Sequence, residues 1–184
     1  MVVVIVLVVV LLIVALGVVW SRNKLVRLRN RVDNGWAQID VQLKRRADLI
    51  PNLVETVKGY AAHEKDTLTA VVTARNAALG ATGPAQAGAA DGALSGALRQ
   101  LFALAESYPT LKADANFRQL QGELSSTENE IAATRQSYND TVMSYNARVQ
   151  MFPTMIWAAM MHFTKRELFT VTDPADRAVP KVQF

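Results

Sequence analysis

The first twenty residues carry no charged side chain and contain nothing more polar than Gly17. A helix of this length rises roughly 30 Å, which is about the thickness of the hydrocarbon core of a bilayer. Nearly every side chain in the segment is aliphatic, so transfer into lipid is favourable along its whole length. The sequence therefore predicts a single transmembrane helix over residues 1–20. The residues expected to anchor it are Val2, Ile5, Leu12, Leu16 and Trp20.

A cleaved signal peptide is the alternative for this segment. Such a peptide needs a basic start, an apolar stretch of about 7 to 15 residues and a cleavage site of small residues. Here no lysine or arginine precedes the apolar run, the run is longer, and residues 19–22 form a poor cleavage site. Lipid attachment through a cysteine is excluded because the chain has no cysteine. We therefore expect the span to be retained.

Basic residues follow the span immediately and predict its orientation. Five basic residues lie between the span and Asp33, the first acidic residue. On its other side the span is preceded by Met1 alone. The positive-inside rule therefore places the amino end outside and the rest of the chain in the cytoplasm. Anionic headgroups attract each nearby base by about 1 kcal/mol, so these residues are expected to contact the membrane surface. This basic collar consists of Arg22, Lys24, Arg27, Arg29 and Arg31.

The distribution of charge argues against nucleic-acid binding. The formal net charge is +4 at pH 7, and the excess of bases lies beside the predicted span. A protein that binds nucleic acid would interleave its bases with aromatic side chains over a whole face. We therefore expect the lipid bilayer, and not a nucleic acid, to be the partner of these bases.

Beyond the span, apolar residues recur at helical spacing almost everywhere, and the alternation of strands is absent. A stripe between Leu25 and Leu43 follows the span without any helix breaker, so one long helix is expected to leave the bilayer. Pro51 is the first interruption. It fits either a new helix capped by Asp48 or a kink in the same helix.

The middle of the chain has weaker helical signals. Residues 77–96 are mostly alanine and glycine, which predicts a flexible connection. Asp91 is expected to cap the next helix, and Pro109 to end it. Asn116 and Gln119 then form the pattern of a capping box at the start of the longest helix.

That longest helix shows the most regular pattern. From residue 117 to residue 152, the side chains expected to face inward alternate steps of three and four. The mean of about 3.5 residues per turn is typical of left-handed coiled-coil packing. Together these patterns predict an all-α protein, in which a single transmembrane helix precedes an elongated antiparallel bundle of about four helices over residues 21–152.

Two blocks of sequence resemble the signature of the LemA family. The first is DVQLKRRADLIPNLV at residues 40–54, continued by VKGYAAHE at residues 57–64. The second covers residues 120–129, and the pairs at 138–139 and 145–146 and Phe152-Pro153 also match. The resemblance extends over roughly residues 20–163. It implies one amino-terminal span in the bacterial plasma membrane with a cytoplasmic helical domain.

The resemblance implies less about activity. One relative is linked to building magnetosome membranes, and others are encoded near membrane metalloproteases, so a role in organising membranes is expected. The alanine- and glycine-rich region at 77–96 and the chain after Phe163 depart from the family pattern. Nothing is transferred from the family to either of them.

The first matching block contains charged residues at helical spacing. Lys44 lies four residues from Asp40, and both Lys44 and Arg45 lie within reach of Asp48. Exposed ion pairs, each worth a few tenths of a kcal/mol, are the simpler interpretation. The alternative is a polar contact between subunits or with a partner helix, which makes these four residues candidate interaction residues.

A second set of candidate interaction residues is the pair Tyr138-Asn139, which recurs one heptad later as Tyr145-Asn146. Buried tyrosines whose hydroxyl groups are hydrogen-bonded are the simpler interpretation. The asparagines would otherwise set the register of the helix or the choice of partner.

An apolar segment follows the longest helix, over residues 153–169. The most apolar stretch here, residues 151–163, overlaps this segment and is too short to span a bilayer as a helix. It is expected to pack on the bundle or to lie among the lipid headgroups. In the second case the inserted residues would be Phe152, Ile156, Trp157, Met160 and Phe163. The tail at 170–184 is expected to be extended.

Catalysis has little support in the sequence. The two histidines, His63 and His162, are far apart, and the Glu-x-x-His motif of di-iron sites is absent. We therefore expect no enzyme activity, no metal and no cofactor. Two functions remain: a non-enzymatic scaffold that forms homo-oligomers and organises or shapes the membrane, or an adaptor that binds and regulates another membrane protein such as a metalloprotease.

Overall fold

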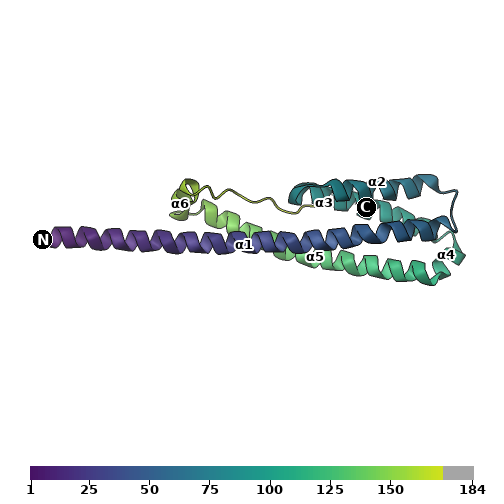
Figure 1. The fold of residues 1–184 in the computed structure, drawn as a ribbon, viewed down its shortest axis with the longest axis horizontal. Helices are drawn as coiled ribbons and strands as arrows, with labels where there is room; N and C mark the ends of the chain where they lie inside the picture. Colours follow the sequence, from purple (N-terminus) through teal and green to yellow (C-terminus); the bar gives the residue numbers. More distant parts are fainter. Residues whose placement is uncertain (172–184) are drawn as a thin grey trace, which may run out of the picture. The chain divides into compact units, whose positions relative to one another are not determined.

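The computed structural model describes residues 1–171 of the 184-residue chain. All the regular structure in this part of the chain is helical, which confirms the prediction of an all-α protein (Figure 1). A long helix with an apolar start comes first, and several helices pack against it. The helices are α1 (Val2–Lys58), α2 (Lys65–Gly80), α3 (Gly83–Ala105), α4 (Pro109–Ala113), α5 (Ala115–Gln150) and α6 (Thr154–Met160).

Helix α1 is a single helix of 57 residues that includes both the apolar start of the chain and Pro51. Its continuity confirms that no breaker follows the apolar segment. Pro51 neither begins a new helix nor ends this one, so Asp48 does not serve as a cap. The fully buried Ile50 and Leu53 flank the proline. Their packing offsets the backbone hydrogen bond that the proline removes.

The chain divides into two compact units, and both α1 and α5 contribute to each of them. The first unit consists of Met1–Ala37 and Gln136–Glu167. The second unit consists of Gln38–Arg135 and residues 168–171 of the described chain.

The second unit has a continuous hydrophobic core. Its buried side chains come from the carboxyl part of α1, from α2, α3 and α4, and from the amino part of α5. Phe102 and Phe117 meet edge to face with ring centroids 6.1 Å apart. Removal of these side chains from water is the main force that holds the helices together. Core members include Ile50, Leu53, Val57, Leu68, Val71, Leu94, Leu98, Leu101, Leu111 and Leu124.

The prediction of a flexible connection over residues 77–96 is wrong. Helix α2 continues to Gly80 and α3 begins at Gly83, so only two residues separate the helices. Pro84 occupies the first turn of α3, where its missing N–H would have had no helical partner. Asp91 therefore lies inside α3 and does not cap it. Buried contacts of α3 with the rest of the unit outweigh the weak helix propensity of its glycines.

The cap of α5 is also different from the predicted one. Helix α5 begins at Ala115, and the backbone N–H of Phe117 donates to Oδ1 of Asp114 at 2.9 Å. Asp114 is therefore the capping residue, and Asn116 lies within the first turn. The hydroxyl of Tyr60 donates to the other carboxylate oxygen of Asp114 at 3.0 Å. The Phe117 N–H above all, and the Tyr60 hydroxyl as well, hold the pKa of Asp114 below its ordinary value.

This cap predicts a dependence of stability on pH. An acid whose folded pKa is lowered contributes stability above its unfolded pKa of about 4, and that contribution is lost as the pH falls through the folded pKa. We expect Asp114→Ala to lower the Tm at pH 7, and the difference from wild type to shrink as the pH falls below about 4. Thermal unfolding followed by circular dichroism measures this. A difference that stays constant from pH 7 to pH 3 would contradict the electrostatic part of the account.

Candidate membrane-facing and interaction sites

The apolar start of α1 is exposed along almost its whole length, and only Val18 is half-buried. In the part of the chain that the structure describes, α1 is the one helix with a segment long and apolar enough to cross a membrane, and none of that segment is buried. The predicted anchor residues are all more than half exposed. A contiguous row of exposed aliphatic side chains is unfavourable in water and is typical of a helix that faces lipid. This exposure suggests membrane anchoring. The anchor residues are Val2, Ile5, Leu12, Leu16 and Trp20.

Residues of the basic collar lie beside aromatic rings of the first unit. The Lys24 ammonium lies 5.2 Å from the centroid of the Trp20 ring. The Arg29 guanidinium lies 5.5 Å from the Phe163 ring, which belongs to the predicted interfacial segment. These are cation–π distances. Contact of the collar with lipid headgroups stays a prediction. The most exposed residues of the basic collar are Arg22, Arg27, Arg29 and Arg31.

The charged candidate residues of α1 are on the surface of the second unit. Lys44 pairs with Asp40 at 2.6 Å, and both side chains are exposed, as the simpler interpretation of the pattern expected. Arg45 and Asp48 are exposed as well. Their role in binding another subunit or a partner stays a prediction.

Between these surface residues lies a buried charge that the sequence analysis missed. Arg46 is buried and donates to Oδ1 of Asp91 at 2.6 Å, which ties α1 to α3. Its Nη2 also lies 3.5 Å from a carboxylate oxygen of Glu128 on α5. The pattern held a signal for this pair: Arg46 is four residues before Ile50, and Asp91 is three before Leu94, so each lies on the buried face of its helix.

The environment of Asp91 opposes its ionisation. Burial raises the pKa of the Asp91 carboxyl above its ordinary value, and the Arg46 guanidinium offsets part of that rise. Arg46 Nε is buried and has no hydrogen-bond partner among the described residues. A buried ion pair is weak evidence for net stability, but loss of either partner leaves an uncompensated charge in the core. The pair therefore joins α1 to α3 by a contact that neither residue can lose without leaving the other charge buried.

The two predicted tyrosines are buried in the first unit and hold an extended segment of the chain. The Tyr138 hydroxyl donates to the carbonyl oxygen of Glu167 at 2.8 Å, and the Tyr145 hydroxyl to that of Thr164 at 2.9 Å. This confirms the simpler interpretation of buried tyrosines with hydrogen-bonded hydroxyls. Burial raises the pKa of both phenols. Trp36 packs against Tyr138, with ring centroids 6.2 Å apart.

Asn146 also holds the extended segment, because its side-chain amide forms two hydrogen bonds with the backbone of Arg166, like a residue of a neighbouring strand. Its side-chain amide donates to the Arg166 carbonyl and its oxygen accepts from the Arg166 N–H, both at 2.8 Å. The Arg166 side chain in turn pairs with Asp33 of α1 at 3.0 Å. One asparagine therefore fixes the register of the extended segment against α5. The recurrence of Tyr-Asn one heptad apart was the signal for this contact, although its partner segment could not be read from it.

In the second unit, too, an extended segment of the chain lies against a helix. Residues 168–171, which we call the docked segment, place Phe169 in a buried position with 1% of its surface exposed. A side chain on Gly88 of α3 would collide with the backbone of Thr170. Glycine at this position therefore allows the docked segment to lie directly on the helix. The rest of the predicted extended tail, residues 172–184, lies outside the described residues.

This close approach predicts a specific effect of Gly88→Ala. The added methyl group would displace the docked segment, and overpacking of this kind costs about 1 to 3 kcal/mol. We expect a lower Tm and faster amide hydrogen exchange in residues 168–171. Gly96→Ala on the same helix is the matched control, because its added Cβ meets nothing within 4 Å. Equal effects of the two substitutions would show that helix propensity, and not the docked segment, determines the outcome.

The predicted interfacial segment forms α6, which packs on the first unit through one side only. Thr154 and Ala158 are buried, and the Ser21 hydroxyl of α1 donates to Thr154 Oγ1 at 3.2 Å. The other side of the segment is exposed, with Phe152 at 77% and Met160 at 71%. One side of the segment therefore packs on the first unit, and insertion of its exposed side among lipid headgroups stays a prediction. The exposed side also includes Ile156, whereas Trp157 and Phe163 are half-buried.

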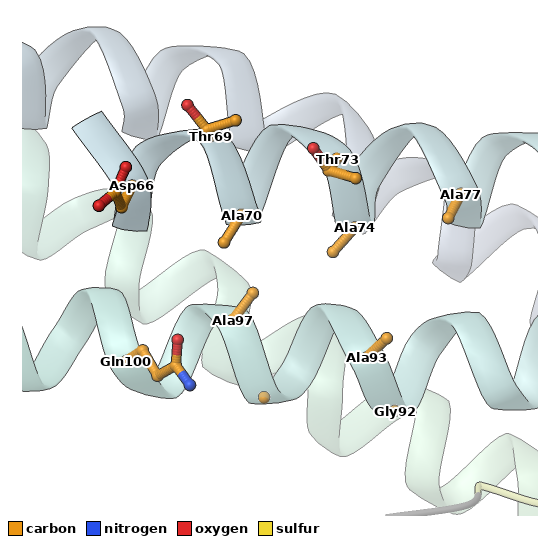
Figure 2. Close-up of a pocket in the computed structure, with 11 residues that line it drawn as sticks. Asp66, Thr69, Ala70, Thr73, Ala74, Ala77, Gly92, Ala93, Ala97 and Gln100 are labelled. Carbon is orange, nitrogen blue, oxygen red and sulfur yellow. The ribbon is translucent and has the colours of Figure 1, made fainter.

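A groove of small side chains separates α2 from α3 in the second unit. Figure 2 shows Ala70 and Ala74 of α2 pointing toward Ala93 and Ala97 of α3. The open space above them has a volume of about 780 Å³, and Asp66 and Gln100 lie at one end. Across residues 1–171, no group of three or more histidine, aspartate or glutamate side chains is arranged to hold a metal ion. The groove therefore offers shape and a largely apolar surface, with Asp66 at one end.

Sequence comparisons identify relatives of this chain among known proteins. The chain is 28% identical to Protein LemA of Metamycoplasma hominis over 159 residues, which is 84% of this chain and 71% of that protein. It is 24% identical to Magnetosome protein MamQ of Magnetospirillum gryphiswaldense, over 72% of this chain and 58% of MamQ. Magnetosome protein MamQ 2 of Paramagnetospirillum magneticum is 29% identical over 90 residues, 49% of this chain and 33% of that protein. The LemA family profile matches residues 35–184, and the chain therefore belongs to the LemA family.

Proposed function

We propose that this protein is a membrane-anchored, non-enzymatic scaffold that self-assembles at the cytoplasmic face and organises the bilayer. The observation that carries the proposal is the exposed apolar start of α1, in which no residue of the candidate span is buried. An exposed apolar helix of this length is most stable when lipid covers its side chains. The five bases that follow the row favour the cytoplasmic side for the remaining helices.

Two surfaces support assembly with further copies. The exposed side of α6 presents flexible methionines, Met155 and Met160, beside Phe152. Such side chains adapt to irregular apolar partners. The groove between α2 and α3 offers small residues, against which another helix would approach closely. The MamQ relatives are named magnetosome proteins, which agrees with a role at a membrane.

An adaptor that binds and regulates another membrane protein is the second candidate function. It is favoured by the exposure of Asp40, Lys44, Arg45 and Asp48, which present charge along one stretch of α1. Charged surfaces of this kind give selectivity between partners and rapid association. In that case, a membrane metalloprotease would be a candidate partner. The purified protein would be a monomer until its partner is added.

A single cysteine placed at the exposed Ala132 of α5 tests orientation and assembly together. The wild-type chain has no cysteine, so Ala132→Cys would be the only labelled site. We expect a membrane-impermeant maleimide to label it only after the cells are opened. A bis-maleimide added to native membranes should join pairs of copies into a product of twice the chain mass of 20.2 kDa.

Each result has a clear contrary outcome. Labelling in intact cells would overturn the cytoplasmic orientation. Cross-linking to a different protein without any self-linked product would overturn the scaffold and support the adaptor. Ala133→Cys, on the neighbouring exposed position of α5, is the matched control for the accessibility of the label.

A further inference from the structure

The first unit contains a cavity of about 390 Å³ between α1, the end of α5 and α6. This volume is within the range of sites that hold small organic ligands, about 300 to 1,000 Å³. One part of the wall is apolar and the other carries hydroxyl groups and a guanidinium. The apolar part includes Val14, Gly17, Val18, Phe152 and Trp157, and the polar part Ser21, Thr154 and Arg148.

The cavity extends along the end of the apolar segment of α1. Val14, Gly17 and Val18 belong to that segment, whereas Ser21 follows its last residue, Trp20. With a rise of 1.5 Å per residue, the lining reaches roughly 10 Å along the helix. If α1 spans the bilayer, as the proposed function requires, one end of the cavity lies at the depth of the acyl chains and the other at the headgroups.

Arg148 supplies the polar end with a donor that the protein leaves unused. Its guanidinium lies 5.6 Å from the Trp20 ring centroid, so the ring holds it at the cavity. Its Nε is buried and has no hydrogen-bond partner within residues 1–171. A buried donor without an acceptor is costly. Among common ligand groups, phosphate fits the planar guanidinium best, since it accepts two parallel hydrogen bonds.

We infer that this cavity binds one anionic phospholipid of the surrounding bilayer. Its phosphate would accept hydrogen bonds from Arg148, and the first methylene groups of one acyl chain would lie against Val14, Gly17 and Val18. The basic collar begins at Arg22, one residue beyond the cavity, and favours a headgroup with net negative charge. The lipid would join α1 to α6 at the membrane surface. This inference rests on the proposed anchoring of α1.

The test is retention of phosphatidylglycerol by the full-length protein in mild non-ionic detergent, counted by native mass spectrometry across a lipid titration. We expect one lipid to bind in preference to phosphatidylcholine. Arg148→Gln should weaken the apparent Kd about tenfold, as expected for loss of one charge-assisted hydrogen bond. Gly17→Leu should weaken it similarly, because an added Cβ at Gly17 meets nothing within 4 Å and the larger side chain would fill the cavity.

Matched controls separate the cavity from the general charge and bulk of the region. Lys165→Gln removes an exposed base that belongs to neither the cavity nor the basic collar, and Ala15→Leu enlarges an exposed residue of the span that does not line the cavity. Both should stay within about twofold of wild type in apparent Kd. Circular dichroism of each variant reports whether it is folded. Should Arg148→Gln unfold the protein, Gly17→Leu still tests the cavity, because it adds only an apolar group at a lipid-facing helix.

Flotation with vesicles of phosphatidylglycerol and phosphatidylcholine distinguishes failure of this inference from failure of the proposed function. If every variant floats and retains lipid like wild type, the cavity site is wrong and the anchor stands. If the wild-type protein does not float, the anchor itself is wrong. Displacement of the retained lipid by millimolar glycerol 3-phosphate would overturn a bilayer lipid as the ligand, in favour of a soluble phosphate.

Discussion

Asp91→Ala should lower the free energy of unfolding by about 3 to 5 kcal/mol, the usual cost of removing one partner from a buried ion pair. The Arg46 side chain is 2% exposed and that of Asp91 is 7% exposed, so the remaining guanidinium would have almost no access to water. Glu128, whose carboxylate lies 3.5 Å from Arg46 Nη2, would compensate the charge only in part, because its side chain is 58% exposed. Thermal or urea unfolding of the full-length protein in detergent, followed by circular dichroism, measures the loss.

Two variants control this measurement. The double replacement Arg46→Met with Asp91→Leu should cost less than Asp91→Ala, because apolar side chains of similar size remove both charges together. Asp40→Ala breaks the exposed pair with Lys44 and should change the free energy of unfolding by less than about 0.5 kcal/mol. If Asp91→Ala is as mild as Asp40→Ala, the buried pair does not hold α1 and α3 together.

Two lysines in the apolar start of α1 should abolish membrane insertion. Each lysine at the centre of a span costs about 2.5 to 3.5 kcal/mol, so Val8→Lys with Leu12→Lys removes most of the driving force from a single helix. We expect the variant to leave the membrane fraction after alkaline carbonate extraction, while the wild type stays in the pellet. The exposed fractions of Val8 and Leu12 are 50% and 58%, so the substitutions break no buried contact.

The matched control is Val8→Ala with Leu12→Ala, which shortens the same side chains without adding charge and should remain in the membrane pellet. Retention of the doubly charged variant in the carbonate-resistant pellet would show that another part of the chain, such as the exposed side of α6, attaches the protein to the membrane. That result would move the anchor away from residues 1–20.

Features with a local cause were predicted well from the sequence. The long helix α1 follows from an uninterrupted apolar stripe, and α5 follows from the regular steps of three and four that place Tyr138 and Tyr145 on its buried side. Helical periodicity reports which side of a helix is covered, whatever covers it. The apolar character of residues 1–20 likewise predicted a long apolar helix at the start of the chain, and its exposure in the structure suggests membrane anchoring.

Features with a distant cause were missed or assigned wrongly. The sequence at 77–96 suggests flexibility because glycine weakens an isolated helix, but Gly88 is there to admit the docked segment from the other end of the chain. Arg46 and Asp91 are 45 residues apart, and nothing local shows that the two buried faces meet. The cap at Asp114 rather than Asn116 differs by only two positions, which is the ordinary error in locating helix ends.

The most direct test of the scaffold is the mass of the full-length protein in mild detergent, measured by light scattering behind a size-exclusion column. The account predicts a discrete species many times the chain mass of 20.2 kDa after the detergent is subtracted. A single-chain mass at every protein concentration would contradict self-assembly and would favour the adaptor.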